Sequence, residues 1–196
     1  MAEEKKVLLQ PIQVEEMSVK IVGTSPLLMD RFPDAARQEI IDKQAGVSKG
    51  QKKKREIKKE MHDAVHLTPK GKPGFPAQGF KKGMVDATSL ASDSVRTFNK
   101  KHVVGLQIVN CEGGIVPLKF SKQDILQHTI GCNTKFSPQF HDWSCVLSIR
   151  YDSSNISAAD IINLLKYAGF HVGVGAWRPK GKDGGSGSFG MYDVAM

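Results

Sequence analysis

The sequence from Cys145 to Gly169 reads CVLSIRYDSSNISAADIINLLKYAG and predicts a strand followed by a helix. Apolar and polar side chains alternate in its first seven residues, as they do in a strand with one buried face. Ser157 and Asp160 then mark a helix start, because the hydroxyl can cap free amides and the carboxylate suits the positive end of the helix dipole. Apolar residues recur at helical spacing up to Gly169, which is a typical helix end.

Comparable patterns occur on both sides of this stretch. Residues 17–23 (MSVKIVG) alternate as a half-buried strand, and apolar residues recur at helical spacing over 80–91. The apolar run 103–109 (VVGLQIV) predicts a buried strand that turns back into a second strand at 115–118. Residues 189–194 predict a last strand.

Together these elements predict an α+β fold with a ferredoxin-like (RRM-like) core in one domain, residues 1–196. Their order is strand, insertion, helix, two strands, an extra strand, helix and strand. With one strand treated as an addition, this is the βαββαβ pattern. The segment 121–143 has no clear period and is left unassigned.

A lysine-rich insertion interrupts this pattern at residues 44–74, after a short helix expected over 34–41. Its densest part, Lys49–Lys59, reads KGQKKKREIKK and offers almost no periodic apolar positions. Such a run cannot supply a core. We therefore predict an inserted basic arm that is mobile until a partner neutralises it; a solvated, partly helical linker is the alternative.

Composition indicates a cytoplasmic protein with a polyanionic partner. The net charge is +8, which favours nucleic acid; a solvated lysine face is the alternative. No apolar run approaches the roughly 20 residues that span a bilayer, so no membrane partner is expected. The charged N-terminus is no secretory signal, and three cysteines without close pairing suit a reducing compartment.

The glycine-rich segment from Gly173 to Gly190 is the most informative candidate for binding. Glycine has no Cβ, so its backbone amide can approach a phosphate closely. Trp177 offers a face for stacking a base, and Arg178 and Lys180 add positive charge. A flexible surface hairpin is the alternative. The segment matches neither a dinucleotide-binding fingerprint nor a P-loop.

Three segments in the same order resemble the RAMP superfamily, the ferredoxin-like RNA-binding subunits of CRISPR effector complexes and their relatives. Ile21–Leu28 (IVGTSPLL) resembles the first strand and its turn, and Gly74–Met84 (GFPAQGFKKGM) resembles the entry to the first helix. Gly173–Gly190 resembles the closing glycine loop and strand. The loop is longer than usual and the chain shorter than many backbone subunits, which suits a phage-encoded or mobile-element relative that binds DNA.

The resemblance implies an RNA-recognition-like core, oligomerisation along a strand, and backbone contacts from the helix entry and the glycine loop. We predict single-stranded nucleic acid as the ligand, RNA favoured, coated by a homo-oligomer or filament, with Trp177 or Phe75 near the bases. The predicted binding residues are the cations of the arm, the helix entry, the polar cluster after that helix and the glycine loop, with one aromatic: Lys49, Lys52, Lys53, Lys54, Arg55, Lys58, Lys59, Lys81, Lys82, Arg96, Lys100, Lys101, Trp177, Arg178, Lys180 and Lys182.

A metal site has weaker support in the sequence. The spacing His-x3-Cys-x8-His-x3-Cys unites His128, Cys132, His141 and Cys145, and these residue types suit zinc. The spacing matches no common finger, and a thiol at the start of a strand packs well in an apolar core. We therefore predict neither a metal nor a cofactor.

Catalysis is the other weak candidate. Some related subunits cut RNA with an aspartate after the first strand, and Asp30 or Asp34 resembles it; a helix cap at Asp34 is the simpler account. No paired base and nucleophile stands out, so no catalytic residue is predicted. The alternatives are a RAMP-like endoribonuclease, a phage single-stranded DNA-binding or annealing protein, and an assembly protein whose arm binds an acidic protein.

Overall fold

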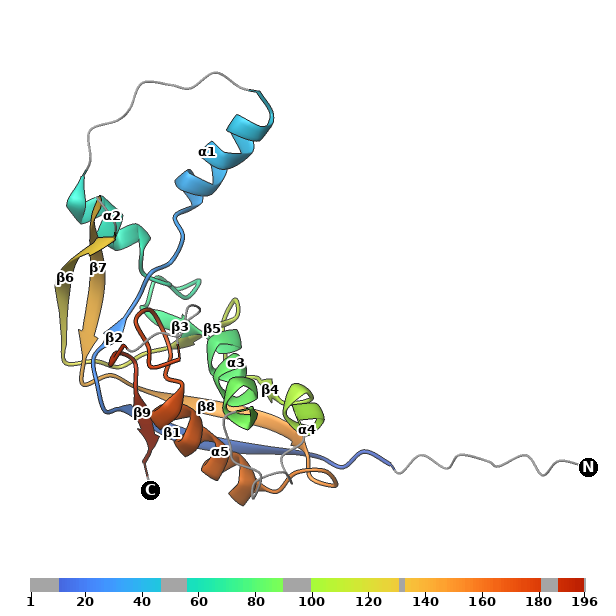
Figure 1. Cartoon of the computed structure of the whole chain (residues 1–196). Coiled ribbons are helices and arrows are strands. Elements are labelled where there is room, and N and C mark those ends of the chain that lie inside the picture. Colours follow the sequence, from blue (N-terminus) through green and yellow to red (C-terminus); the bar gives the residue numbers. More distant parts are fainter. Residues whose placement is uncertain (1–10, 47–55, 90–99, 131–132, 181–186, 196) are drawn as a thin grey trace, which may run out of the picture.

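A computed structural model describes residues 11–46, 56–89, 100–130, 133–180 and 187–195 (Figure 1). The chain combines helices with antiparallel strand pairs, in agreement with the predicted α+β class. Among the described residues, no helix is long and apolar enough to cross a membrane.

The largest sheet has four antiparallel strands. Its order is β4 (Gln107–Ile108), β8 (Ser144–Asp152), β1 (Val14–Gly23) and β9 (Tyr192–Val194). The central pair runs from Val14 opposite Asp152 to Val22 opposite Ser144. In both central strands alternate residues are buried, which gives the sheet one apolar face.

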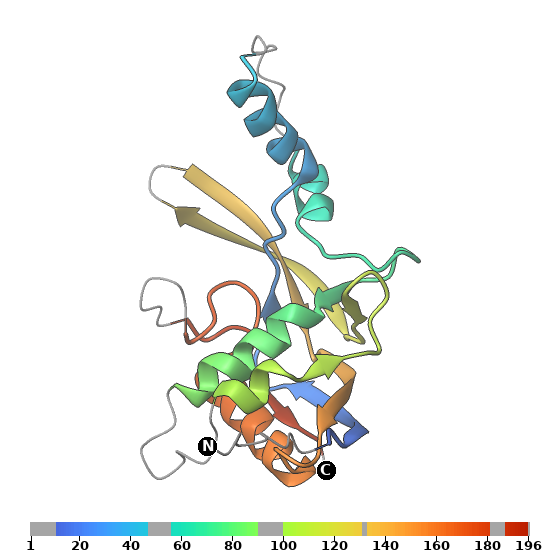
Figure 2. The same cartoon turned by 90° about the vertical axis from the view of Figure 1, so that its right-hand side faces the viewer.

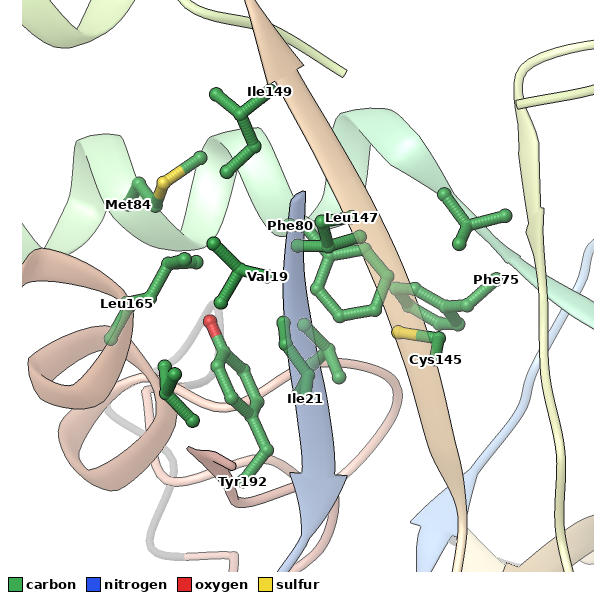
Figure 3. Packing of buried hydrophobic residues seen from close by; sticks show 14 of the residues in the cluster. Val19, Ile21, Phe75, Phe80, Met84, Cys145, Leu147, Ile149, Leu165 and Tyr192 are labelled. Atoms are coloured by element: carbon green, nitrogen blue, oxygen red, sulfur yellow. The ribbon is translucent and has the colours of Figure 1, made fainter. Parts of the chain in front are cut away.

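Two helices, α3 (Ala77–Thr88) and α5 (Ala158–His171), supply most of the helical side chains that pack against this face. The predicted cap at Ser157 is confirmed, and Asp160 completes a capping box by accepting from the Ser157 amide. Figure 3 shows the resulting core, in which side chains from both helices and three strands meet: Val19, Ile21, Phe80, Met84, Leu147, Ile149, Leu165 and Tyr192.

A second sheet and two further helices extend from this core (Figure 2). Strands β6 (Lys122–Ile130) and β7 (Asn133–His141) form a long hairpin, and β7 also pairs with β2 (Leu27–Leu28). The helices α1 (Asp34–Gln44) and α2 (Ile57–Asp63) lie at this end of the molecule.

A short two-stranded sheet joins these parts. It consists of β3 (Gly74–Pro76) and β5 (Ile115–Pro117). The predicted hairpin of 103–109 with 115–118 is therefore wrong, because β5 pairs with β3 whereas β4 pairs with β8.

The predicted strand at 103–109 is also wrong over its first half. Residues Lys100–Val104 form a helix, α4, and only Gln107 and Ile108 belong to a strand. Val103 and Leu106 are both buried, so the apolar run reflects burial, which periodicity in so short a segment cannot assign to a helix or a strand.

The lysine-rich insertion differs from its prediction at the C-terminal end. Ala64 and Val65 are buried and Val65 joins the core, so this part does supply apolar contacts. The densest run of lysines, at 49–55, lies outside the described residues. The helix expected over 34–41 is present as α1.

Candidate nucleic-acid interface

The described members of the predicted binding set lie on three helices and in the glycine loop. Lys58 and Lys59 belong to α2, whereas the others lie on α3 and in the glycine loop. Of Lys100 and Lys101 only the backbone is described, in α4. The remaining residues of the set lie outside the described part of the chain: Lys49, Lys52, Lys53, Lys54, Arg55, Arg96 and Lys182.

Lys82 and Lys180 approach the same residue of α3. The Lys82 Nζ is 4.0 Å from an Asp86 carboxylate oxygen, and the Lys180 Nζ donates to the Asp86 carbonyl at 3.2 Å. Lys180 also donates to the Ser89 hydroxyl at 3.1 Å. The Asp86 carbonyl also accepts from the Ser89 amide and hydroxyl, so Lys180 adds a cation at the negative end of the α3 dipole and ties the glycine loop to the helix.

The glycines of the loop allow the backbone to pack closely against the turn before β2. The Gly190 amide donates to the Pro26 carbonyl at 2.8 Å, and the Ala176 amide donates to the Leu28 carbonyl at 2.9 Å. A Cβ on Gly190 would lie 1.7 Å from the Val174 carbonyl oxygen. The amides of Gly190 and Ala176 therefore already have acceptors within the protein. Residues 181–186 of the loop lie outside the described part of the chain, so phosphate binding by the loop stays a prediction.

Trp177 stands at the surface in an uncommon backbone conformation. Its φ is 55°, which a bulky side chain rarely adopts, and its side chain is 49% exposed. The Trp177 carbonyl accepts from the Phe189 amide at 3.1 Å, and a Cβ on Gly187 would lie 1.8 Å from that carbonyl oxygen. The close passage of Gly187 and the bond to Phe189 therefore hold the strained residue in place.

The tip half of the β6–β7 hairpin meets this tryptophan. The rings of His128 and Trp177 are 5.2 Å apart and nearly perpendicular, at 69°. Lys135 lies directly opposite His128 in the strand register, so both belong to the same face of the hairpin, and Lys135 forms an ion pair with Asp30. We call Trp177, His128, Lys135 and Asp30 the aromatic corner.

Sequence reasoning missed His128 and Lys135 as members of this site. Both lie in the segment 121–143, whose side chains are mostly half-buried or exposed, so no apolar period marked it as a hairpin. No local signal could have found the contact between residues 128 and 177, because only the packing of the glycine loop against the hairpin creates it.

A groove of about 400 Å³ runs beside the entry to α3. Gln78 and Lys81 line it from the helix, and residues 106–109, Cys111 and Gly114 line it from the opposite side. The resemblance to the RAMP superfamily predicts contacts with the nucleic-acid backbone at this helix entry. Phe75, by contrast, is buried and packs edge-on against Phe80, so its predicted place near bases is wrong.

The four residues of the His/Cys pattern are distributed over different parts of the fold. Cys145 is buried in the main core, and burial raises the pKa of its thiol to about 12. His128 contacts Trp177, whereas His141 lies 3.3 Å from an Asp124 carboxylate oxygen. Cys132 lies outside the described residues. Within the described ranges, no group of His, Cys, Asp and Glu side chains is arranged to hold a metal ion.

The two aspartates considered for catalysis both form ion pairs. Asp30 pairs with Lys135, and Asp34 pairs with Arg31. Asp34 is the first residue of α1 rather than its cap; the cap position belongs to Pro33, which makes no side-chain bond. The expected cap at Asp34 is therefore wrong, because the helix begins one residue earlier than a capping aspartate requires.

Comparisons with known proteins find similarity to solved structures only at the level of the fold. No family model matches the sequence, and no curated protein matches it. Among solved structures, the chain is similar to the crystal structure of Cmr6 from Pyrococcus furiosus. The two share 11% sequence identity, with a TM-score of 0.46, over 94% of this chain and 100% of that chain.

Proposed function

We propose that this protein is a RAMP-like domain that binds single-stranded nucleic acid, RNA favoured, as an oligomer along the strand. Two observations support the ferredoxin-like core: the strand order β4-β8-β1-β9, and the packing of α3 and α5 against the apolar face of that sheet. The net charge of +8 supports a polyanionic ligand.

The aromatic corner is the observation on which the proposal depends most. Trp177 presents an aromatic ring that is half exposed, yet held by its backbone and by the His128 ring. A ring that is already ordered loses little entropy when a base stacks on it. Such stacking contributes about 1–3 kcal/mol per base and tolerates any sequence. Arg178 supplies positive charge beside the ring, whereas the charge of Lys135 is balanced by Asp30.

The phosphate contacts belong to the cationic residues. We assign to Lys81 a contact with a phosphate of the nucleic acid at the helix-entry groove. Lys58 and Lys59 contact further phosphates, together with the cationic residues predicted for the arm within 49–55. Each phosphate neutralised on a single strand steepens the dependence of log Kd on log salt by about 0.7. Bases and phosphates are thus bound by different residues, which can be separated by experiment.

Trp177→Ala is expected to weaken binding of labelled oligo-uridylate about 5- to 150-fold, the equivalent of one stacked base. The slope of log Kd against log salt should stay unchanged, because no phosphate contact is lost. Lys81→Ala should instead lower that slope by about 0.7. Fluorescence anisotropy at several salt concentrations measures both quantities, and oligo-thymidylate tests the preference for RNA.

Phe170→Ala is the matched control for Trp177, since Phe170 is a 65% exposed aromatic residue on α5. It should leave the affinity unchanged. No binding by the unaltered protein, or binding that does not respond to salt, would remove the proposal. Nucleic acid that co-purifies with the protein would favour it over an acidic protein partner.

A ribonuclease activity at Asp30 is the second candidate function. The observation that favours it is the position of Asp30 within the aromatic corner, where it pairs with Lys135 opposite His128. Labelled RNA should be incubated with excess protein, with and without a divalent metal. Cleavage that disappears in Asp30→Ala would support this candidate, whereas intact RNA would retire it.

A further inference from the structure

An apolar groove of about 430 Å³ lies between α2 and β6, two elements that Figure 1 shows side by side. Val65 in its lining is buried, whereas Leu67 is 36% exposed and Ile125 is 51% exposed. Pockets that hold small ligands typically have volumes of about 300–1,000 Å³. The groove is therefore large enough for one such group, and its exposed apolar side chains are uncovered without a ligand.

The polar side chains of this groove are cationic or neutral. Lys58 and His62 line it from α2, and Gln123 lines it from β6. None of its described lining residues is acidic. The acidic residues of α2, Glu60 and Asp63, lie about 140–160° from Lys58 around the helix axis, so the helix turns them away from the Lys58 side. The rim at Lys58 is thus suited to an anionic group.

The groove and the aromatic corner use the two faces of one hairpin. Ile125 and His128 are three residues apart on β6, so their side chains point to opposite faces, about 10 Å apart along the strand. The sheet order is β2-β7-β6, and within the described residues no strand pairs with the outer side of β6. A nucleic-acid strand with a base on Trp177 can therefore pass over this edge and reach the groove.

We infer that the α2–β6 groove holds one base of the bound strand, an inference that rests on the proposed function. Ile125 and Leu67 cover the faces of the base, Gln123 meets its edge, and Lys58 binds the adjoining phosphate. A glutamine amide offers donors and an acceptor, which an edge of any base can match. The groove is therefore expected to tolerate any sequence, as stacking on Trp177 does.

Charge favours a nucleotide over an apolar peptide as the occupant. Five of the seven residues 49–55, which immediately precede Glu56 and α2 in the sequence, are lysine or arginine. Together with Lys58 and Lys59 they give the entry to α2 a strong positive charge, which attracts a polyanion. An apolar groove beside such a charge suits a ligand that is flat and apolar at one end and anionic at the other.

Photo-cross-linking and affinity measurements on the full chain test this inference. Oligo-uridylate that carries 4-thiouridine should give adducts on lining residues such as Met61 or Ile125 when it is irradiated with the protein. Ile125→Asp should weaken binding about 5-fold, the lower end of the loss for one stacked base, because the groove has no aromatic ring among its described lining residues. Ile125→Trp should instead strengthen binding, a gain that damage to the fold does not produce.

Val146→Asp is the matched control. Val146 is 46% exposed on β8, and the substitution adds the same charge at a similar strand position. It should leave both the affinity and the adducts unchanged.

The outcomes separate this inference from the proposed function. Unchanged affinity of Ile125→Asp, with adducts only outside the groove, would overturn the inference and leave the function standing. No binding of oligo-uridylate by the unaltered protein would overturn both. If Ile125→Asp changed the sedimentation of the protein without nucleic acid, the groove would belong to a second copy, and the inference would again be wrong.

Discussion

Phe80→Ala is expected to lower the free energy of unfolding by about 3–5 kcal/mol. Phe80 is fully buried, and its ring packs edge-on against Phe75 at 5.5 Å and against Tyr192 at 6.0 Å. It therefore connects α3 with β3 and with β9. Truncation removes apolar contacts on three elements at once, and the surrounding strands can close little of the cavity because each is held by its own pairing.

Urea unfolding followed by circular dichroism measures this loss. Phe170→Ala removes the same side chain from a site that is 65% exposed, and should change the free energy of unfolding by less than about 0.5 kcal/mol. Equal effects of the two substitutions would contradict the packing of α3 against the sheet. An unchanged m-value would show that the folded and unfolded states keep their compactness.

Gly190→Ala is expected to destabilise the protein by about 3 kcal/mol or more, the sum of a backbone and a packing cost. Gly190 has a φ of 66°, where an L-residue costs about 1–2 kcal/mol. Its new methyl group would also lie 1.7 Å from the Val174 carbonyl oxygen, an overlap that backbone movement must relieve. That movement breaks the bond from the Gly190 amide to Pro26.

Gly71→Ala separates the two costs. Gly71 has a φ of 74° but nothing within 4 Å of the position of a Cβ, so this substitution carries only the backbone cost. In thermal unfolding, the Tm of Gly190→Ala should be well below the Tm of Gly71→Ala. Equal Tm values would show that Gly190 and Val174 do not pass as closely as described. Because Gly190 follows Phe189, whose amide binds the Trp177 carbonyl, Gly190→Ala should also weaken nucleic-acid binding.

Several elements were predictable because their local patterns agree with their tertiary surroundings. The alternation in 17–23 and 145–151 corresponds to β1 and β8, which have one buried face each. The helix at 158–171 begins at its predicted cap, Ser157. In these segments each residue is buried or exposed as the period requires, so the sequence alone sufficed.

Other elements were not predictable because nothing local distinguishes them. The run 103–109 is apolar where it is helical and where it is extended, since Val103 of the helix and Ile108 of the strand both pack against the same core. The β6–β7 hairpin has little buried face, and its alternation is correspondingly weak. Strand partners also depend on the whole chain, which is why β5 pairs with β3 and not with the strand before it.

For the candidate site, the sequence by itself determined the ingredients: a surplus of positive charge, a glycine-rich loop and a tryptophan within it. Only the tertiary structure decided how they are used. Lys180 stabilises the end of α3, the glycines pack against the turn before β2, and Trp177 meets a histidine 49 positions earlier in the chain. The physical reason is that composition sets which ligands a chain attracts, whereas contacts between distant segments decide which side chains remain available to bind them.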